Sequence, residues 1–313
     1  MPQPFENDPF ILIQVPSGWG RETQVRRLIA GCGYLGLRVA RNWINVGDRV
    51  YGITRSAVRA GHFRELGLEP LVADVADLGT LPVLPEVDTL LWCVGFDRSG
   101  SPMQAVYVDG LRNLLSRLPE PVGRVIYISS TGVYGQTDGS WVDEMSECRP
   151  SRVGGRACLA AEQLLEQSPW ASRSVILRLA GIYGPGRLPR LQTLRAGEPL
   201  DGDPDGWLNL IHVEDAAAIV GLVSERTLEL PRVYAVADGH PVMRREFYAE
   251  VARLWQTPPA EFRTVSGGPQ RDDRHGGGHK RVNTTRLQQE LAPSLHYPTY
   301  RHGLTAMAAG PTH

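Results

Sequence analysis

Short apolar segments alternate with longer amphipathic segments along most of this chain. Residues 87–94 (VDTLLWCV) are almost continuously apolar, as expected of a strand that is buried on both faces of a sheet. Residues 35–46 instead carry their apolar side chains at helical spacing. Strands separated by helices predict an α/β fold with a doubly wound parallel sheet.

The same pattern predicts the other main elements. Further strands are expected at 25–30, 49–55, 68–73, 124–130, 174–180 and 232–237. Further helices are expected at 103–118, 155–167, 214–224 and 244–255. Loop-rich stretches at 197–206 and 267–278 interrupt the alternation.

A glycine-rich hexapeptide, GCGYLG, joins the first expected strand to the first expected helix. In this context the first glycine permits a tight turn, the second lets a pyrophosphate approach the backbone, and the third lets helix pack on strand. The helix N-terminus then presents free N–H groups to the phosphates. The alternative is an ordinary glycine turn. We predict a dinucleotide site, to which this turn contributes Gly31, Gly33, Tyr34, Leu35 and Gly36.

The end of the second strand indicates which dinucleotide is bound. An NAD site usually has an acidic residue there for the ribose 2′-hydroxyl, whereas arginine suits the 2′-phosphate of NADP. No acidic residue lies between Asp48 and Glu65, and Arg55 occupies the relevant place. The alternative is that Arg55 caps a surface turn. We therefore expect NADP rather than NAD as the cofactor.

Composition excludes several classes of protein. The 313 residues suffice for one large α/β unit or two lobes, and the net charge of −1 gives no electrostatic case for nucleic acid or an anionic membrane. The four cysteines form no C-x-x-C pair, so neither a zinc site nor a disulfide framework is indicated. Two histidines in the 275–279 loop make a poor metal site. We expect no bound metal, no membrane span and a cytoplasmic location.

Three further motifs, elsewhere in the chain, add to the indication given by the glycine-rich turn. They are YISSTGVYG at 127–135, LRLAGIYGPG at 177–186 and NLIHVED at 209–215. With these motifs the chain resembles the extended short-chain dehydrogenase/reductases, the NAD-dependent epimerase/dehydratase group. The resemblance covers residues 25 to about 291. It implies a Rossmann domain of residues 25–180 plus 207–240, and a small substrate lobe of residues 181–206 plus 241–313. Residues 1–24 would be an extra arm or a mis-called start.

The resemblance also implies roles for individual residues. Ser130 matches the serine that assists catalysis, and Tyr134 is a second candidate that could swing into the pocket. The adenine would contact Asp74 and Val75, and its ribose would lie beside Gly95. The residues expected around the substrate pocket are Thr131, Arg187, Asn209 and His212. His212 would titrate near neutrality as a base, or it would be structural.

The chain departs from the family at the acid/base pair. The family's Tyr-x-x-x-Lys places both side chains on one helical face. Here the two slots fall on Gly154 and Cys158. No tyrosine lies between Tyr134 and Tyr183, and Lys280 is the only lysine, so no shifted alignment recovers the pair. This combination resembles the atypical subgroup that keeps the glycine motif and loses the pair.

Two functions therefore remain open. The first is an NAD(P)-dependent oxidoreductase or epimerase-like enzyme, NADP favoured, acting as a monomer or homodimer on an unknown small molecule such as a nucleotide sugar. The second is a catalytically silent NADP-binding sensor or interaction protein. The retained pocket motifs favour the enzyme, and the missing pair favours the sensor.

Overall fold

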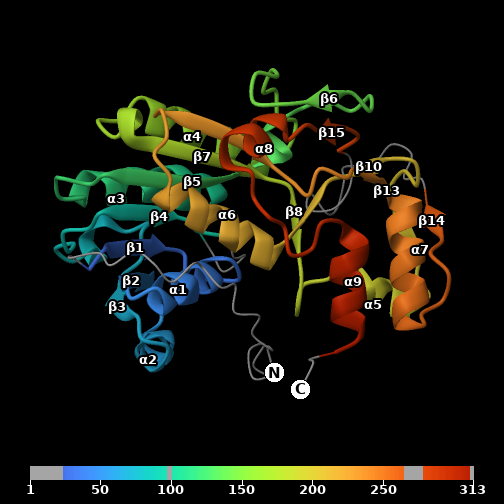
Figure 1. The fold of residues 1–313 in the computed structure, drawn as a ribbon, viewed down its shortest axis with the longest axis horizontal. Coiled ribbons are helices and arrows are strands. Elements are labelled where there is room, and N and C mark those ends of the chain that lie inside the picture. Colours follow the sequence, from blue (N-terminus) through green and yellow to red (C-terminus); the bar gives the residue numbers. More distant parts are fainter. Residues whose placement is uncertain (1–23, 97–100, 264–277, 311–313) are drawn as a thin grey trace.

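A seven-stranded parallel sheet forms the centre of the molecule, in the order β12-β7-β5-β4-β1-β2-β3 (Figure 1). The computed structural model describes residues 24–96, 101–263 and 278–310; the N-terminal arm and most of the 267–278 stretch lie outside these ranges. The strands are β1 Arg26–Ala30, β2 Arg49–Thr54, β3 Glu69–Val72, β4 Thr89–Trp92, β5 Arg124–Ser130, β7 Ser174–Leu179 and β12 Arg232–Val236. The prediction of a doubly wound parallel sheet is confirmed.

Helices cover both faces of the sheet. The helices of one face are α1 (Gly36–Asn45), α2 (Ala57–Glu65) and α6 (Val213–Glu225), and those of the other are α3 (Gly110–Arg117) and α4 (Val153–Glu166). Successive side chains of a strand point to opposite faces. In β1, Ile29 packs into the core under α1, α2 and α6, while Leu28 and Ala30 pack into the core under α3 and α4 on the opposite face. Both faces need apolar residues, which explains the continuous apolar strands.

The helix expected at 103–118 is divided. A π-helical turn, η2, covers Ala105–Asp109, and α3 begins only at Gly110. Such π-helical turns are rare in proteins, and those that occur often lie at functional sites. The wider turn changes the direction in which its side chains point, and it packs against α4. Three short 3₁₀ turns complete this part: η1 Leu78–Thr80, η3 Thr131–Val133 and η4 Ala171–Arg173.

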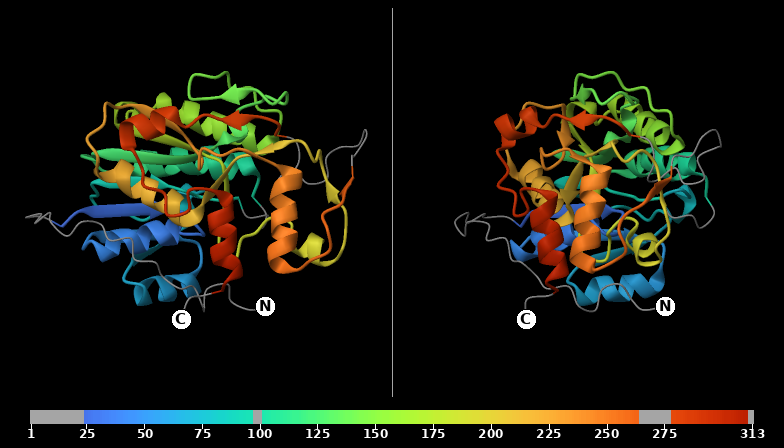
Figure 2. Two further views of the ribbon diagram at one scale, coloured as in Figure 1. Left: turned by 45° about the vertical axis from the view of Figure 1, so that its right-hand side comes forward. Right: turned by 90° about the vertical axis from the view of Figure 1, so that its right-hand side faces the viewer.

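A smaller group of elements stands beside the sheet (Figures 1 and 2). Its helices are α5 (Leu191–Arg195), α7 (Arg244–Trp255) and α9 (Tyr300–Ala308). Its short strands are β9 Leu200–Asp201, β10 Trp207–Leu208, β13 Val242–Met243 and β14 Phe262–Arg263. Phe247, Tyr300 and Leu304 belong to a separate apolar core between these helices. Most of these elements lie within residues 181–206 and 241–313, and the role of these residues as a substrate lobe stays a prediction.

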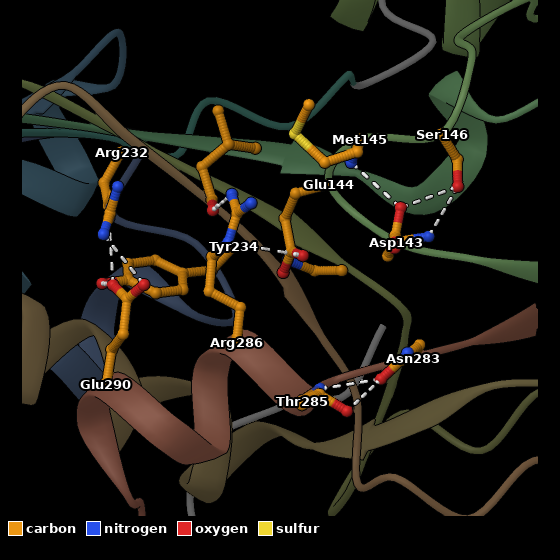
Figure 3. Close-up of polar contacts among 12 residues, drawn as sticks. Asp143, Glu144, Met145, Ser146, Arg232, Tyr234, Asn283, Thr285, Arg286 and Glu290 are labelled. Atoms are coloured by element: carbon orange, nitrogen blue, oxygen red, sulfur yellow. Dashed lines mark hydrogen bonds and ion pairs between the residues drawn. The ribbon is translucent and has the colours of Figure 1, made fainter.

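Two short parallel pairs join the parts: β8 (Gly181–Tyr183) with β11 (Leu210–His212), and β6 (Trp141–Val142) with β15 (Arg281–Val282). After β15, helix α8 (Thr285–Leu291) returns to the edge strand β12. Glu290 of α8 accepts hydrogen bonds from Arg232 and Tyr234, as Figure 3 shows. The late chain is thereby attached to the large sheet as well as to the small lobe.

Candidate functional site

The glycine-rich turn has the geometry of a phosphate-binding loop. Gly31 has φ +93°, and a Cβ there would lie 2.5 Å from the backbone of Cys93. A Cβ on Gly36 would lie 2.5 Å from the carbonyl oxygen of Gly31. A Cβ on Gly33 would meet its nearest atom only at 4.0 Å. Packing therefore requires the first and third glycines, whereas the second leaves open the space that a pyrophosphate needs.

Helix α1 begins directly after this turn. The N-terminal residue Leu35 makes no side-chain cap hydrogen bond, and no acidic residue lies in the first helical turn. Backbone N–H groups at a helix N-terminus have no intrahelical partner and carry the positive end of the helix dipole. The first turn of α1 itself therefore carries no anionic side chain, and its geometry fits a dinucleotide phosphate.

Two arginines lie where the cofactor's adenosine end is expected. The Arg55 Nη1 atom is 3.9 Å from Asp74 Oδ2, and both side chains are partly exposed. Arg59 donates from Nη2 to the carbonyl oxygen of Cys32, inside the glycine-rich turn, at 2.7 Å. Ser56, not Arg55, provides the side-chain cap of α2. The guanidinium of Arg55 is therefore not used as the cap of this turn.

The other residues expected near adenosine lie at the same edge of the sheet. Asp74 accepts a hydrogen bond from the Ala76 N–H at 2.9 Å, which fixes the turn after β3. The carbonyl of Val75 accepts from Asn113 at 3.0 Å. A Cβ on Gly95 would meet nothing within 4 Å. These residues follow the carboxyl ends of parallel strands, where open α/β sheets bind their ligands. Their contacts with a cofactor stay a prediction.

Tyr34 connects the glycine-rich turn to the predicted substrate side. The guanidinium of Arg38 lies 4.5 Å from the centre of its ring, and that of Arg187 lies 5.4 Å away. Arg187 itself is held in the G-P-G turn by paired backbone hydrogen bonds with Gly184. A residue predicted for the cofactor and one predicted for the substrate are thus in contact.

Ser130 lies at the end of β5, where its hydroxyl oxygen accepts the Gly132 N–H at 3.0 Å. Thr131 begins the 3₁₀ turn that follows, and both residues are half-buried. Helix α4 packs tightly on this turn, because a Cβ on Gly155 would lie 2.2 Å from the carbonyl oxygen of Gly132. The hydroxyl hydrogen of Ser130 can still be donated to a ligand.

The helix that should carry the acid/base pair carries neither residue. At Gly154 a Cβ would meet only Met103 Sδ, at 3.7 Å. Burial raises the pKa of the Cys158 thiol to about 12, so the nucleophilic thiolate is scarce near neutral pH. Cys158 therefore behaves as a small, protonated side chain.

A tyrosine that the sequence analysis did not select lies against this helix. Tyr107 is half-buried on the π-helical turn, and its hydroxyl oxygen accepts the Phe96 N–H at 3.1 Å. Burial raises its pKa, the nearby Cys158 thiol raises it further, and the positive charge of Arg187 lowers it. The phenol is thus protonated at neutral pH. The helical pattern hid Tyr107, since an unbroken helix would orient it differently.

Tyr134 has a different environment from the one expected of a catalytic group. Its side chain is buried, and its hydroxyl oxygen accepts from Arg178 Nη1 at 3.2 Å. Arg178 is also buried, in a 2.8 Å ion pair with Glu162, which accepts a hydrogen bond from Ser129. Burial raises the pKa of Tyr134 to about 12. The geometry gives Tyr134 a packing role, and its catalytic role stays a prediction.

The two polar residues of the N-L-I-H motif hold neighbouring segments together. His212 is buried and accepts the Glu214 N–H at 3.3 Å as the cap of α6. Burial, and then the charge of Arg38, lowers its pKa to about 3, so the imidazole is neutral near pH 7. Asn209 donates to the Lys280 carbonyl at 2.9 Å and accepts the Val282 N–H at 2.7 Å. Asn209 therefore fixes the position of Lys280.

Among the residues that the structure describes, no three histidine, cysteine or acidic side chains gather as metal ligands would. Within the same ranges, no helix has the length and apolar character needed to cross a bilayer.

Fold and turn together define a dinucleotide-binding Rossmann protein of the extended type. The model of the NAD dependent epimerase/dehydratase family matches residues 28–237. The chain is 32% identical to Protein YeeZ of Escherichia coli (strain K12) over 287 residues. The aligned region covers 86% of this chain and 95% of that protein. The chain therefore belongs to the NAD dependent epimerase/dehydratase family.

Solved structures agree with this assignment. A functionally unknown conserved protein from Silicibacter pomeroyi DSS is 31% identical, with a TM-score of 0.75 and coverage of 91% of this chain and 99% of that one. MoeE5 in complex with UDP-glucose and NAD is 21% identical, with a TM-score of 0.71 and coverage of 91% and 97%. The second likeness shows a shared fold.

Proposed function

We propose that this protein binds NADP and is an oxidoreductase or epimerase-like enzyme acting on a small molecule. The open face of Gly33, at the N-terminus of α1, carries the proposal, because a Cβ there would meet no protein atom closer than 4.0 Å, which leaves the backbone open to the approach of a pyrophosphate. UDP-glucose, the ligand of MoeE5, supports a nucleotide sugar as one substrate class to assay. Four free thiols are consistent with a cytoplasmic protein.

The preference for NADP over NAD rests on positive charge at the end of β2. Arg55 and Arg59 bring two guanidinium groups to the place where the adenosine ribose is expected. Guanidinium groups bind phosphate oxygens through charge-assisted hydrogen bonds, whereas a ribose 2′-hydroxyl is better held by a carboxylate. Asp74 is the nearby carboxylate, and its ion pair with Arg55 partly neutralises it.

The chain offers two hydroxyl groups for the chemistry. When bound, the nicotinamide supplies hydride transfer. Ser130 hydrogen-bonds the reacting oxygen of the substrate, because its oxygen is fixed by Gly132 and its proton is available. Tyr107 gives a proton to that oxygen, since its own oxygen accepts the Phe96 N–H and its phenol stays protonated near pH 7. Arg187 stabilises the phenolate that results.

Titration with NADPH and NADH tests the cofactor. We expect NADPH to bind more tightly, and Arg55→Ala to weaken NADPH by about tenfold or more, the value of a charge-assisted hydrogen bond. The same change should leave NADH nearly unaffected. Arg64→Ala, at the last turn of α2, is the matched control. Tighter binding of NADH, or an unchanged NADPH affinity in Arg55→Ala, would refute the NADP preference.

Turnover of NADPH against carbonyl compounds and nucleotide sugars tests the enzyme. We expect Ser130→Ala and Tyr107→Phe each to lower kcat by about 100-fold, in line with losing one positioned proton donor, with NADPH affinity retained. Ser116→Ala, on the exposed side of α3, should have no effect. Unchanged turnover in either variant removes that residue from the mechanism. NADPH binding without turnover of any substrate would support the sensor instead.

A further inference from the structure

A buried ion pair lies close to the Ser130 turn, residues 130–133. Glu162 of α4 is 1% exposed, and Arg178 of β7 is 6% exposed. Arg178 Nη2 donates to Glu162 Oε2 at 2.8 Å, and Arg178 Nε lies 3.2 Å from each carboxylate oxygen. This bidentate contact fixes the position of α4 against β7.

The ion pair also holds the chain on both sides of the Ser130 turn. Ser129, the residue before Ser130, donates its hydroxyl hydrogen to Glu162 Oε1. Arg178 Nη1 donates to the Tyr134 hydroxyl oxygen at 3.2 Å, and the guanidinium carbon lies 5.2 Å from the centre of that ring. Tyr134 directly follows the 3₁₀ turn. We call Ser129, Tyr134, Glu162 and Arg178 the turn clamp.

The sheet decides where these contacts fall. Ser129 and Arg178 are direct register partners in the parallel strands β5 and β7, so both side chains leave the sheet on the face that α4 covers. Ser130 comes next in the strand, and its oxygen instead accepts the Gly132 N–H. The turn clamp and the proposed reacting hydroxyl are therefore neighbours in the chain with separate partners.

Stability alone is a poor reason for a buried ion pair. Taking two charges out of water costs free energy that their attraction often only offsets, and well-packed apolar residues of similar volume are often equally stable. An apolar pair has no directional contacts, however, and it would leave the hydroxyls of Ser129 and Tyr134 without these partners. A satisfied buried polar network instead fixes one conformation of the groups that it joins.

We propose that Glu162 and Arg178 are positioning residues for Ser130, which through Ser129 and Tyr134 hold the turn where the Ser130 hydroxyl meets the reacting oxygen of the substrate. The inference rests on the proposed function in taking Ser130 as the group that contacts the substrate. A displacement of about 1 Å at a reacting group can lower a rate by about 100-fold. Loss of part of the turn clamp should therefore reduce turnover although Ser130 itself is unchanged.

Two single variants each remove one hydroxyl from the turn clamp and leave its ion pair in place. We expect Ser129→Ala and Tyr134→Phe each to lower kcat about tenfold, with KM and NADPH affinity within about twofold of the wild type. Ser129→Thr keeps the hydroxyl and should restore turnover. Ser174→Ala and Tyr234→Phe are matched controls, since each removes a hydrogen-bonded hydroxyl from a buried side chain elsewhere in the sheet. Both controls should keep the wild-type kcat.

The ion pair is best replaced as a whole, because removal of one partner would leave an uncompensated buried charge. We expect Glu162→Leu/Arg178→Met to fold and to lower kcat by at least about tenfold. If this double variant fails to fold, the two hydroxyl variants carry the comparison.

Ser129→Ala in the Ser130→Ala background separates positioning from a structural role. A residue that acts through Ser130 has no further effect once that hydroxyl is gone, so the double variant should match Ser130→Ala. A second, independent loss of about tenfold would overturn the proposal.

Amide hydrogen exchange, followed by NMR on the full chain, tests the turn clamp without any substrate. The Gly132 N–H donates to Ser130 Oγ at 3.0 Å, so its exchange reports opening of the turn. We expect at least about tenfold faster exchange in Ser129→Ala and Tyr134→Phe, but not in Ser174→Ala or Tyr234→Phe at comparable stability in urea. Unchanged Gly132 exchange in both clamp variants would overturn the proposal.

The exchange measurement also distinguishes the two possible failures. A wild type that neither binds NADPH nor turns over any substrate would refute the proposed function, and so would a Ser130→Ala variant with full turnover refute the role of Ser130. Neither result alters the Gly132 exchange rates, which decide whether the turn clamp holds the turn.

Discussion

Gly31 and Gly33 belong to one turn, but the backbone around them imposes opposite requirements. Gly31 combines a left-handed φ with a close approach to Cys93, so any side chain adds both strain and a clash. Gly33 has neither constraint, and the space over it is where we propose that the pyrophosphate lies. The same residue type thus has a structural reason at one position and a functional reason at the other.

This contrast gives a paired prediction. Gly33→Ala should change the free energy of unfolding by less than about 1 kcal/mol, because its Cβ would meet no atom closer than 4.0 Å, yet weaken NADPH binding by about tenfold or more. Gly31→Ala should instead destabilise the fold by about 3 kcal/mol, the sum of strain and overpacking. Urea unfolding and NADPH titration of both variants check this. Full NADPH affinity in Gly33→Ala would mean that the pyrophosphate does not lie on this turn.

At the scale of elements, helix α4 depends on two adjacent glycines in different ways. Gly155 faces the Ser130 turn, where a Cβ would lie 2.2 Å from Gly132 O and 2.8 Å from Pro150 Cβ. Gly154 has only Met103 Sδ near, at 3.7 Å, just before the π-helical turn. By intrinsic helix propensity alone, both glycines are poor helix formers. Tertiary contact distinguishes them.

We therefore expect opposite effects from alanine at these positions. Gly154→Ala should stabilise the protein by up to about 1 kcal/mol through helix propensity. Gly155→Ala should destabilise it by about 2 kcal/mol, because α4 must move away from the Ser130 turn. Urea denaturation measures both, and NADPH turnover shows whether Ser130 shifts. A Gly155→Ala protein with wild-type stability and turnover would contradict the tight packing of helix on turn.

The main elements could be predicted from hydrophobic spacing because each strand and helix buries a face with its own period. Helix 244–255 and strand 124–130 have the bounds predicted from the sequence. The π-helical turn at 105–109 was missed, since a single inserted residue leaves the apolar pattern almost unchanged. The short strands β6 and β15 were missed because a two-residue pair has no periodicity to detect.

On the scale of the whole molecule, two buried titratable groups change the free energy of unfolding in opposite directions as the pH changes. His212 has its pKa lowered to about 3 in the fold, so stability is lost as pH falls from about 6.5, where the unfolded histidine takes up a proton. Asp238 has its pKa raised to about 7 by burial, so its contribution is lost as pH rises from about 4 through 7. Between pH 4 and 6.5 the two effects partly cancel.

The His212→Asn variant isolates the contribution of His212 to the pH dependence of stability, because asparagine also caps helices and does not titrate. Between pH 7 and pH 5 the wild type should lose about 2 kcal/mol more unfolding free energy than the variant. Urea unfolding at both pH values, with Asp238 present in each protein, measures the difference. Identical losses in the two proteins would show that His212 is not held neutral in the fold.

The sequence by itself determined the parallel sheet and the glycine-rich turn, because periodic burial and glycine stereochemistry are local properties that each segment carries with it. Only the tertiary structure decided which polar side chains lie at the proposed site. It buries Tyr134 and His212 among structural partners and packs the π-helical turn that carries Tyr107 against α4. It also brings Lys280 and Arg244, which are distant in the sequence, to the same glycine, Gly278. Such meetings depend on long-range packing, which no spacing along one chain records.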